Sequence, residues 1–213
     1  MSTPDLPDQQ PLWVSAYETR AGLSNQPSAF LTEVLATMPA GSRVLELGCG
    51  PGIDAAALAE AGHAVTAMDF APNVIARNQA QYAAQANLHF IEGRIDAPYP
   101  FPDHAFDAVY AHLTLHYYRD ADTRAIIAEI RRVLAPGGWL LFACKAPGDP
   151  AHGRGVEIEP NLFDLNGKVR HFFTPEYAES LLSSGFTDIR VAPHTGKLYG
   201  HGSAWITAIA RAT

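Results

Sequence analysis

The sequence predicts an α/β fold in which a mostly parallel β-sheet ends in antiparallel strands. Five short apolar runs alternate with segments of helical periodicity, which is the pattern of consecutive βα units. Two further apolar runs close the chain with only a tight connection between them, so no crossover helix makes them parallel. The length of 213 residues, with 47% hydrophobic and 17% charged residues, fits one globular domain.

The first half of the chain begins with a Pro-rich lead-in at residues 1–26, in which residues 13–20 form a possible lid helix. We expect a single domain over residues 27–213. Glycine and proline mark element ends, with Gly62 as a C-terminal cap and Pro72 at a first helical position. The predicted elements are helices at 28–38, 53–61 and 72–85 and strands at 43–47, 63–68 and 88–92.

The second half of the chain continues the alternation up to residue 144. An apolar stripe at helical spacing predicts a helix at 123–134, and Thr174 caps another helix that ends at Gly185. Residues 145–171 have little periodicity and many glycines and prolines, so we expect an irregular segment that acts as an active-site lid. The predicted strands are 106–111, 139–144, 186–192 and 204–210.

A glycine-rich segment, ELGCGPG at residues 46–52, lies between a predicted strand and a predicted helix. Glycines there allow a tight turn and let a ligand lie against the backbone. Ile53 stands where the dinucleotide-binding fingerprint has its third glycine, which disfavours an NAD-dependent oxidoreductase. Glu46 can face a cationic ligand, and Asp69 can accept hydrogen bonds from a ribose. The structural alternatives are an exposed strand end for Glu46 and a helix N-cap for Asp69.

Four motifs in order resemble the class I S-adenosylmethionine-dependent methyltransferases: VLELGCGPG, MDF, FDAVYA and RVLAPGGWLLF. The resemblance extends from about residue 28 to the C-terminus. It implies a seven-stranded, Rossmann-like, doubly wound sheet with strand order 3-2-1-4-5-7-6 and strand seven antiparallel. The segments AHLTLHYYRD and EIEPNLFDLNGKVRHFF look closest to small uncharacterised and tellurite-resistance-type methyltransferases that act on small molecules.

The resemblance implies S-adenosylmethionine as cofactor and S-adenosylhomocysteine as product. It also implies roles for matching positions near the glycine loop. Gly48 and Gly50 resemble the residues whose backbone faces the methionine part, and Glu46 resembles the acid that fixes this loop. Asp69 resembles the ribose-binding acid and Phe70 the residue beside the adenine.

The segment after the third strand departs from the family pattern. Most relatives have an acid there that meets the adenine amine, whereas this chain has Arg94. Either Asp96 takes over this contact or the backbone at Ile95 alone contacts the adenine. After the fourth strand, Ala111 resembles the residue whose carbonyl meets the ammonium of the cofactor.

The acceptor side of the expected site is less defined. His112 and His116 are candidates for the catalytic group that removes a proton from the acceptor, although both suit half-buried packing equally well. Tyr117 is a tentative substrate-binding residue. Arg170 and His171 are tentative contacts to an anionic acceptor, since they lie at the return of the expected lid. A metal site is not expected, because a His pair at i, i+4 lacks a third ligand.

The function predicted from the sequence is methyl transfer to an unidentified small molecule by in-line displacement. The alternatives are a protein that binds S-adenosylmethionine without catalysis and, with less support, an NAD-dependent oxidoreductase. The net charge of −7 argues against nucleic-acid binding, because neutralising phosphates requires a basic face. Two cysteines and no apolar run long enough for a membrane predict a cytoplasmic protein. The sequence fits a monomer or a homodimer equally well.

Overall fold

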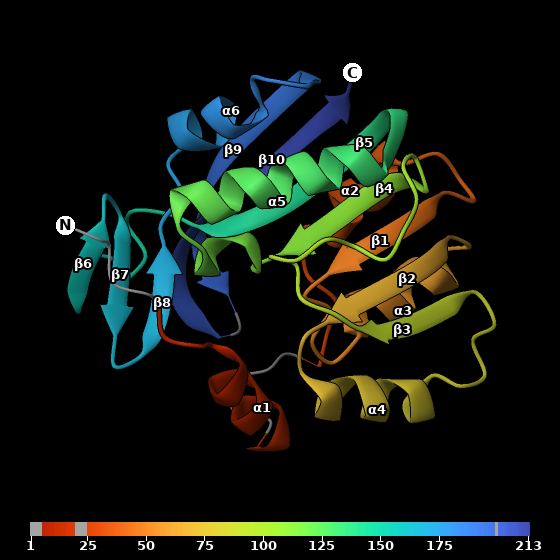
Figure 1. Ribbon diagram of the computed structural model, residues 1–213, viewed down its shortest axis with the longest axis horizontal. Coiled ribbons are helices and arrows are strands. Elements are labelled where there is room, and N and C mark those ends of the chain that lie inside the picture. The colour runs from red at the N-terminus through yellow and green to blue at the C-terminus, as the bar shows by residue number, and fades with distance from the viewer. Residues whose placement is uncertain (1–5, 20–24, 199) are drawn as a thin grey trace.

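A seven-stranded sheet runs through the computed structural model, which describes residues 6–19, 25–198 and 200–213 (Figure 1). Its strand order is β3-β2-β1-β4-β5-β10-β9, and β10 is antiparallel to both neighbours. The predicted order and the antiparallel seventh strand are therefore confirmed. The strands of this sheet are β1 (Arg43–Leu47), β2 (Ala64–Asp69), β3 (Leu88–Glu92), β4 (Phe106–His112), β5 (Leu134–Lys145), β9 (Phe186–Leu198) and β10 (His201–Ala212).

Helices cover both faces of this sheet. On one face α5 and α6 pack over the central and antiparallel strands, while α2 and α3 lie behind the sheet (Figure 1). The helices are α1 (Gln10–Thr19), α2 (Leu31–Thr37), α3 (Ile53–Glu60), α4 (Pro72–Gln81), α5 (Asp120–Val133), α6 (Pro175–Leu182) and the short 3₁₀ turn η1 (Leu115–Tyr117). The predicted cap at Thr174 is present, since its hydroxyl accepts a hydrogen bond from the Tyr177 amide at 3.1 Å.

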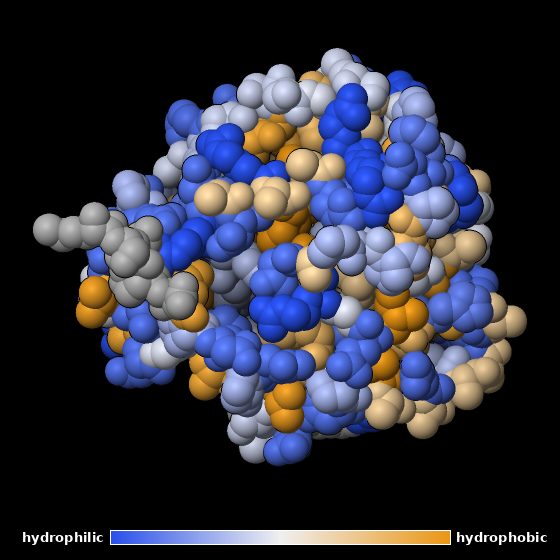
Figure 2. Space-filling model, in the orientation of Figure 1, coloured by the Kyte–Doolittle hydropathy of each residue, from blue (hydrophilic) through white to orange (hydrophobic). Residues whose placement is uncertain are grey.

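The side chains of each central strand alternate between the two faces. In β4, Val109 and Ala111 join the apolar core under α5, whereas Ala108 and Tyr110 join the core under α2 and α3. This alternation follows from the two-residue period of a strand, and burial on both faces explains the apolar run at residues 108–111 of β4. On the face in Figure 2, hydrophobic residues lie scattered among hydrophilic ones, and the exposed large hydrophobics of the described residues are Leu12 and Val156.

The segment at 145–171 is not irregular, and that prediction was wrong. It contains a separate antiparallel sheet of three strands, β6 (Val156–Glu159), β7 (Leu162–Leu165) and β8 (Lys168–His171). Leu165 pairs with Lys168, so the β7–β8 turn is the dipeptide Asn166-Gly167, with φ of 55° and 83°. Asn-Gly with positive φ at both residues is a strong signal for a two-residue hairpin. The expected mobility of this segment as a lid stays a prediction.

The N-terminal helix begins earlier than predicted, at Gln10. Residues 1–5 and 20–24 of the predicted lead-in, including the expected helix end at Arg20, lie outside the described residues. Within the part of the chain that is described, no helix is long and apolar enough to cross a membrane.

Candidate active site

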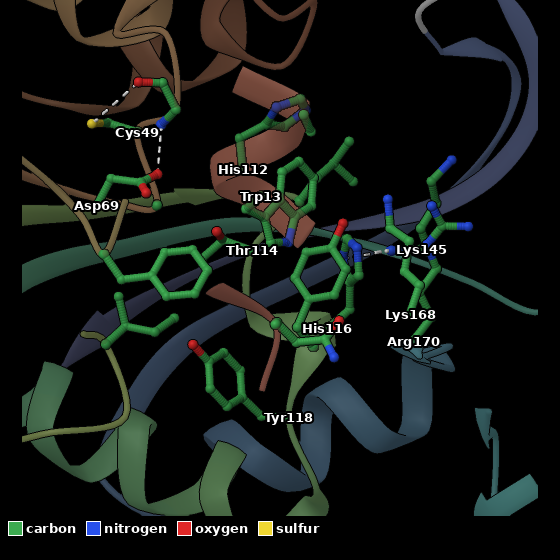
Figure 3. A pocket seen from close by; sticks show the side chains of 18 of the residues that line it. Trp13, Cys49, Asp69, His112, Thr114, His116, Tyr118, Lys145, Lys168 and Arg170 are labelled. Carbon is green, nitrogen blue, oxygen red and sulfur yellow. Dashed lines mark hydrogen bonds between the residues drawn. The ribbon is translucent and has the colours of Figure 1, made fainter. Parts of the chain in front are cut away.

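A cavity of about 810 Å³ opens at the carboxyl ends of β1, β2 and β4. Parallel sheets bind ligands at this edge, beside the point where the strand order reverses, and here that point lies between β1 and β4. The volume is in the range of small-molecule and cofactor sites. Figure 3 shows two groups of charged side chains across the cavity, with Asp69 on one side and Lys145, Lys168 and Arg170 on the other.

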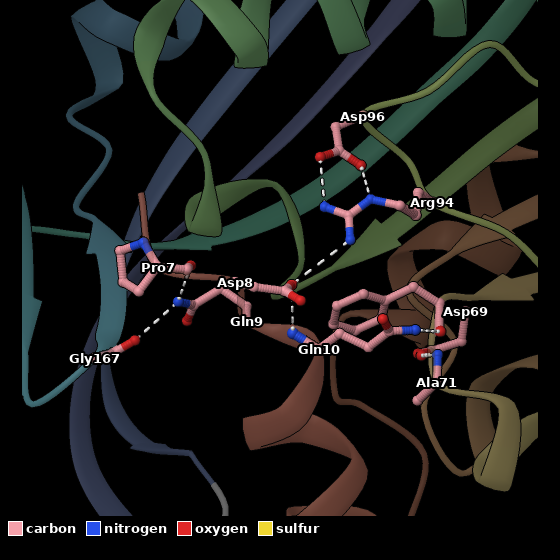
Figure 4. Close-up of polar contacts among 10 residues, drawn as sticks. Pro7, Asp8, Gln9, Gln10, Asp69, Ala71, Arg94, Asp96 and Gly167 are labelled. Carbon is pink, nitrogen blue, oxygen red and sulfur yellow. Dashed lines mark hydrogen bonds and ion pairs between the residues drawn. The ribbon is translucent and has the colours of Figure 1, made fainter. Parts of the chain in front are cut away.

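The N-terminal segment at residues 6–19 forms a roof over the cavity. The Gln9 side chain donates to the Gly167 carbonyl at 2.8 Å and accepts from the Val169 amide at 3.2 Å. Next to it, Gln10 donates to the Phe70 carbonyl at 2.6 Å. The roof therefore joins the β7–β8 hairpin to the loop after β2 (Figure 4).

Asp69 ends β2 at the acidic end of the cavity. One carboxylate oxygen accepts from the Ala71 amide at 3.0 Å, and the other accepts from the Gly50 amide at 2.9 Å and the Tyr17 hydroxyl at 3.2 Å. Burial raises the pKa of Asp69, while these hydrogen bonds oppose the shift. The carboxylate is thus held by the glycine loop and by the roof.

Glu46 and Asp54 complete this end of the cavity. Burial, together with the carboxylates of Asp54 and Asp69, raises the pKa of Glu46 well above its ordinary value. Glu46 Oε2 is buried and has no hydrogen-bond partner among the described residues. Asp54 accepts from the Ser28 amide and from the Tyr110 hydroxyl, both at 2.7 Å. Three carboxyl groups facing one cavity suit a ligand that brings positive charge and hydroxyl donors.

Neighbouring protein atoms leave little room for a side chain at two glycines of the loop. Gly48 and Gly50 have φ of 68° and 49°, in the left-handed region. A Cβ on Gly48 would collide with Thr114 Oγ1 and lie 2.9 Å from Thr114 Cβ. A Cβ on Gly50 would lie 3.3 Å from the Tyr17 hydroxyl. Thr114 and Tyr17 both line the cavity, so the loop, the roof and the segment after β4 fit closely together.

After β3, where this chain departs from the family pattern, neighbouring side chains hold Arg94 in place. Arg94 forms a bidentate pair with Asp96, with N–O distances of 3.0 and 2.8 Å, and its guanidinium lies 5.8 Å from the Phe70 ring centroid (Figure 4). Ile95 is buried between them in the chain and lines the same wall. The Arg94–Asp96 pair and the ring contact thereby hold three consecutive positions of this wall, residues 94–96, beside Phe70.

The two histidines after β4 have different surroundings. His112 Nδ1 lies 3.9 Å from Asp54 Oδ2; burial lowers the pKa of His112 and the Asp54 carboxylate opposes that shift. His116 is 1% exposed, and the Lys145 amide lies 3.5 Å from its Nδ1. Burial and the cations Arg170, Lys145 and Lys168 lower the pKa of His116 well below its usual value. Ala111 is fully buried and does not line the cavity, although His112 beside it does.

The basic end of the cavity comes from β5 and β8. Lys145 pairs with Asp149 at 2.9 Å and donates to the Ser203 hydroxyl at 2.6 Å. Lys168 lies 4.6 Å from the Trp13 ring centroid, and burial with the charges of Arg170 and Lys145 lowers its pKa to about 8. Arg170 shares a hydrogen bond with Tyr117, which also lines the cavity.

His171 lies on the opposite face of β8 from Lys168 and Arg170. Its ring packs against Phe173 and Tyr177, with centroid distances of 4.9 and 4.6 Å, and it does not line the cavity. The pairing of His171 with Arg170 in one acceptor contact does not fit this placement, because neighbouring residues of a strand face opposite sides.

The cavity-lining residues that sequence reasoning missed include Tyr17, Asp54 and Lys145. Asp54 lies in the first turn of the helix after the glycine loop, and Lys145 ends β5. Both positions belong to the carboxyl edge of the sheet, which is a signal the sequence carries. Tyr17 reaches Asp69 only through the packing of α1, which no local pattern indicates.

Comparison with known proteins shows which family the chain belongs to. A methyltransferase domain profile matches residues 44–138. An uncharacterized methyltransferase of Synechocystis sp. is 35% identical over 165 residues, which is 77% of this chain and 75% of the relative. The chain belongs to the class I S-adenosylmethionine-dependent methyltransferases. S-Adenosylmethionine is its cofactor, and the alternative of an NAD-dependent oxidoreductase is thereby wrong.

Two other similarities concern proteins with named substrates. A malonyl-[acyl-carrier protein] O-methyltransferase of Erwinia billingiae is 31% identical over 157 residues, 74% of this methyltransferase and 59% of the relative. The chain spans about half to three fifths of the length of the first such relatives that it matches. The 1,6-didemethyltoxoflavin-N1-methyltransferase of Burkholderia thailandensis, solved with 1,6-didemethyltoxoflavin and S-adenosylhomocysteine, has the same fold. It shows a TM-score of 0.75, 20% identity, and coverage of 100% of this chain and 94% of that one.

Proposed function

We propose that this methyltransferase acts on a small molecule that binds in the cavity between the histidines after β4 and the basic end. The single observation that carries this proposal is the cavity itself, which the N-terminal roof covers and which has room for a second ligand beside the cofactor. A covered cavity of this size accommodates a small acceptor more readily than a folded macromolecule.

The cofactor fits the acidic end of the cavity. Glu46 has a buried oxygen without a partner, and the Asp69 carboxylate faces the space in front of Gly48 and Gly50. We assign the ribose hydroxyls to Asp69 and the adenine to the side of Phe70 and Ile95. Asp96 can accept the adenine amine, because each of its oxygens has a lone pair left after its contact with Arg94. Ala111, whose carbonyl the family resemblance implies as the partner of the ammonium group, does not line the cavity, whereas Glu46 and His112 do.

The bound cofactor supplies a methyl group on a positively charged sulfur that acts as an electrophile. The acceptor atom forms a bond to the methyl carbon as the sulfur–carbon bond breaks, and the bonding electrons stay on sulfur. The protein holds the acceptor atom in line, which can supply about 7–11 kcal/mol of the rate enhancement. Any proton that leaves the acceptor needs a base at this place.

His112 is the better candidate for that base. Asp54 lies beside it and stabilises its protonated form. His116 has the Lys145 amide at Nδ1, which places its own proton on Nε2, and cations surround it. A neutral His116 in this tautomer donates a hydrogen bond from Nε2 and does not accept a proton there. We therefore assign His116 a positioning role.

Release of S-adenosylhomocysteine from a panel of hydroxyl, amine and thiol acceptors tests the proposal. Turnover of at least one small acceptor is expected, and His112→Gln should lower kcat while His116→Gln mainly changes KM. Tight binding of S-adenosylmethionine without turnover of any member would favour a non-catalytic cofactor-binding protein instead.

A further inference from the structure

The basic end of the cavity is formed by alternate residues of one short strand. In β8, Lys168 and Arg170 face the cavity, while Val169 and His171 are buried on the other side. Figure 3 shows both cations beside Lys145 and His116, across the cavity from Asp69. The Asn166-Gly167 turn sets the register that points these two side chains inward.

The charges at this end are not balanced by the protein. Within the described residues, Lys145 has Asp149 as its partner, whereas no ion pair includes Lys168 or Arg170. The Nε of Arg170 is buried without a hydrogen-bond partner, and the neutral Tyr117 is its neighbour. Holding two like charges in a covered cavity is unfavourable unless a negative group joins them.

A small side cavity extends from the same place. It has a volume of about 60 Å³ and is lined by Arg154 as well as by the two cations. The rest of its lining is apolar and consists of Ala151, Phe163, Leu165 and Phe172, and this part suits a short hydrocarbon portion of a ligand.

We propose that the methyl acceptor is a small organic anion whose carboxylate or phosphate group binds Lys168 and Arg170 and whose short apolar portion enters the side cavity. This rests on the proposed function, because it names the class of acceptor for the same site. Arg170 and Lys168 thereby determine acceptor specificity, and the acidic end binds the cofactor. With its anionic group at the basic end and the sulfonium of the cofactor toward the acidic end, the acceptor is also bound in one orientation.

The main competing assignment is that the two cations bind the carboxylate of the cofactor. Their place on a three-stranded sheet outside the seven-stranded fold, opposite Asp69, favours the acceptor. The two assignments predict different changes in S-adenosylhomocysteine affinity when Arg170 is replaced.

Binding of simple probes to the protein loaded with S-adenosylhomocysteine tests the proposal without turnover. The probes are butanoate, its neutral amide butanamide, propyl phosphate and inorganic phosphate, measured by ligand-observed NMR. We expect butanoate or propyl phosphate to bind and butanamide not to bind. Arg170→Gln and Lys168→Gln should each weaken anion binding by about 10- to 100-fold, the range for hydrogen bonds to charged groups. Lys197→Gln removes a charge at an exposed position of β9 and serves as the matched control.

Several results would overturn the proposal. Equal binding of butanamide and butanoate, or no binding by either organic anion at millimolar concentration, removes the anion requirement. A parallel loss of S-adenosylhomocysteine affinity in Arg170→Gln assigns the cations to the cofactor. If inorganic phosphate binds as tightly as propyl phosphate, the apolar portion of the ligand adds no affinity, which contradicts its proposed place in the side cavity. Absence of turnover with every acceptor, while the probes bind as expected, counts against the proposed function and not against the anion site.

Discussion

The two ends of the cavity differ in how completely the protein itself supplies partners for their charged side chains. At the acidic end, Asp69 is held by two backbone amides and the Tyr17 hydroxyl, so its position is fixed before any ligand arrives. At the basic end, Lys168 and Arg170 have no acidic partner among the described residues. The acidic end lies at the edge of the seven-stranded sheet, while Lys168 and Arg170 of the basic end lie on the separate three-stranded sheet. The comparison teaches that one end of the cavity is held in place by the protein's own hydrogen bonds, whereas the other end presents charges that a ligand can neutralise.

The largest expected effect comes from a substitution at the acidic end of the cavity. Gly48→Ala should abolish S-adenosylhomocysteine binding, because its Cβ would collide with Thr114 and the residue keeps a positive φ. The contact with Thr114 Cβ remains after rotation of the hydroxyl. Backbone strain alone costs about 1–3 kcal/mol. Gly41→Ala, with φ of 74° and open space around it, measures that strain by itself. Calorimetry measures the S-adenosylhomocysteine affinity of both variants, and thermal unfolding measures their stability. Equal losses of affinity and of stability in the two variants would show that Thr114 moves aside.

A smaller effect at the same end distinguishes ribose from sulfonium. Asp69→Ala should weaken S-adenosylmethionine and S-adenosylhomocysteine equally, since both carry the same ribose. The loss is about 1.5–3 kcal/mol for each hydrogen bond to the charged group. Calorimetry with both ligands decides it. A loss confined to S-adenosylmethionine would mean that Asp69 interacts with the positive sulfur.

Anion binding at the basic end should respond to pH through Lys168. Lys168 has a pKa of about 8, lowered by burial and by Arg170 and Lys145, so it loses its charge as the pH rises through that value. Butanoate affinity should be constant below about pH 7 and then fall by up to about tenfold per pH unit above pH 8. Lys168→Gln should remove this fall. A pH profile that is unchanged in the variant contradicts the assignment to Lys168.

The smallest effect sharpens the comparison at the roof. One oxygen of Asp69 already accepts from Gly50 and Tyr17, which uses both of its lone pairs. Tyr17→Phe removes one donor, and S-adenosylhomocysteine should then bind about two- to tenfold more tightly, the value of one ordinary hydrogen bond. Calorimetry measures it. Weaker binding would show that the hydroxyl instead contacts the ligand.

Local patterns in the sequence predicted the acidic end and the main sheet well. Glu46, Gly48 and Asp69 lie at strand ends, and strand ends follow from short apolar runs and glycines. The contacts of Tyr17 with Asp69 and of Asp54 with His112 join segments more than 50 residues apart, so no local pattern indicates them.

The basic end was predicted only in part, for a different reason. The Asn166-Gly167 turn signal is present in the sequence, but it lies within residues 145–171, whose many glycines and prolines predict an irregular segment. Without the hairpin register, Arg170 and His171 look equivalent, although only Arg170 faces the cavity. One turn therefore decides which cation meets the acceptor.

The roof has a kinetic consequence. Gln9 is bonded to the hairpin that carries Lys168 and Arg170, and Gln10 to the loop that carries Asp69 and Phe70. Because one segment contacts both ends, we expect methylated product and S-adenosylhomocysteine to leave through the same opening event. Stopped-flow measurement of the two departures should return one common rate constant, and two distinct constants would mean that the ends open separately. A single rate constant would show that residues 6–19 move as one unit before either product leaves.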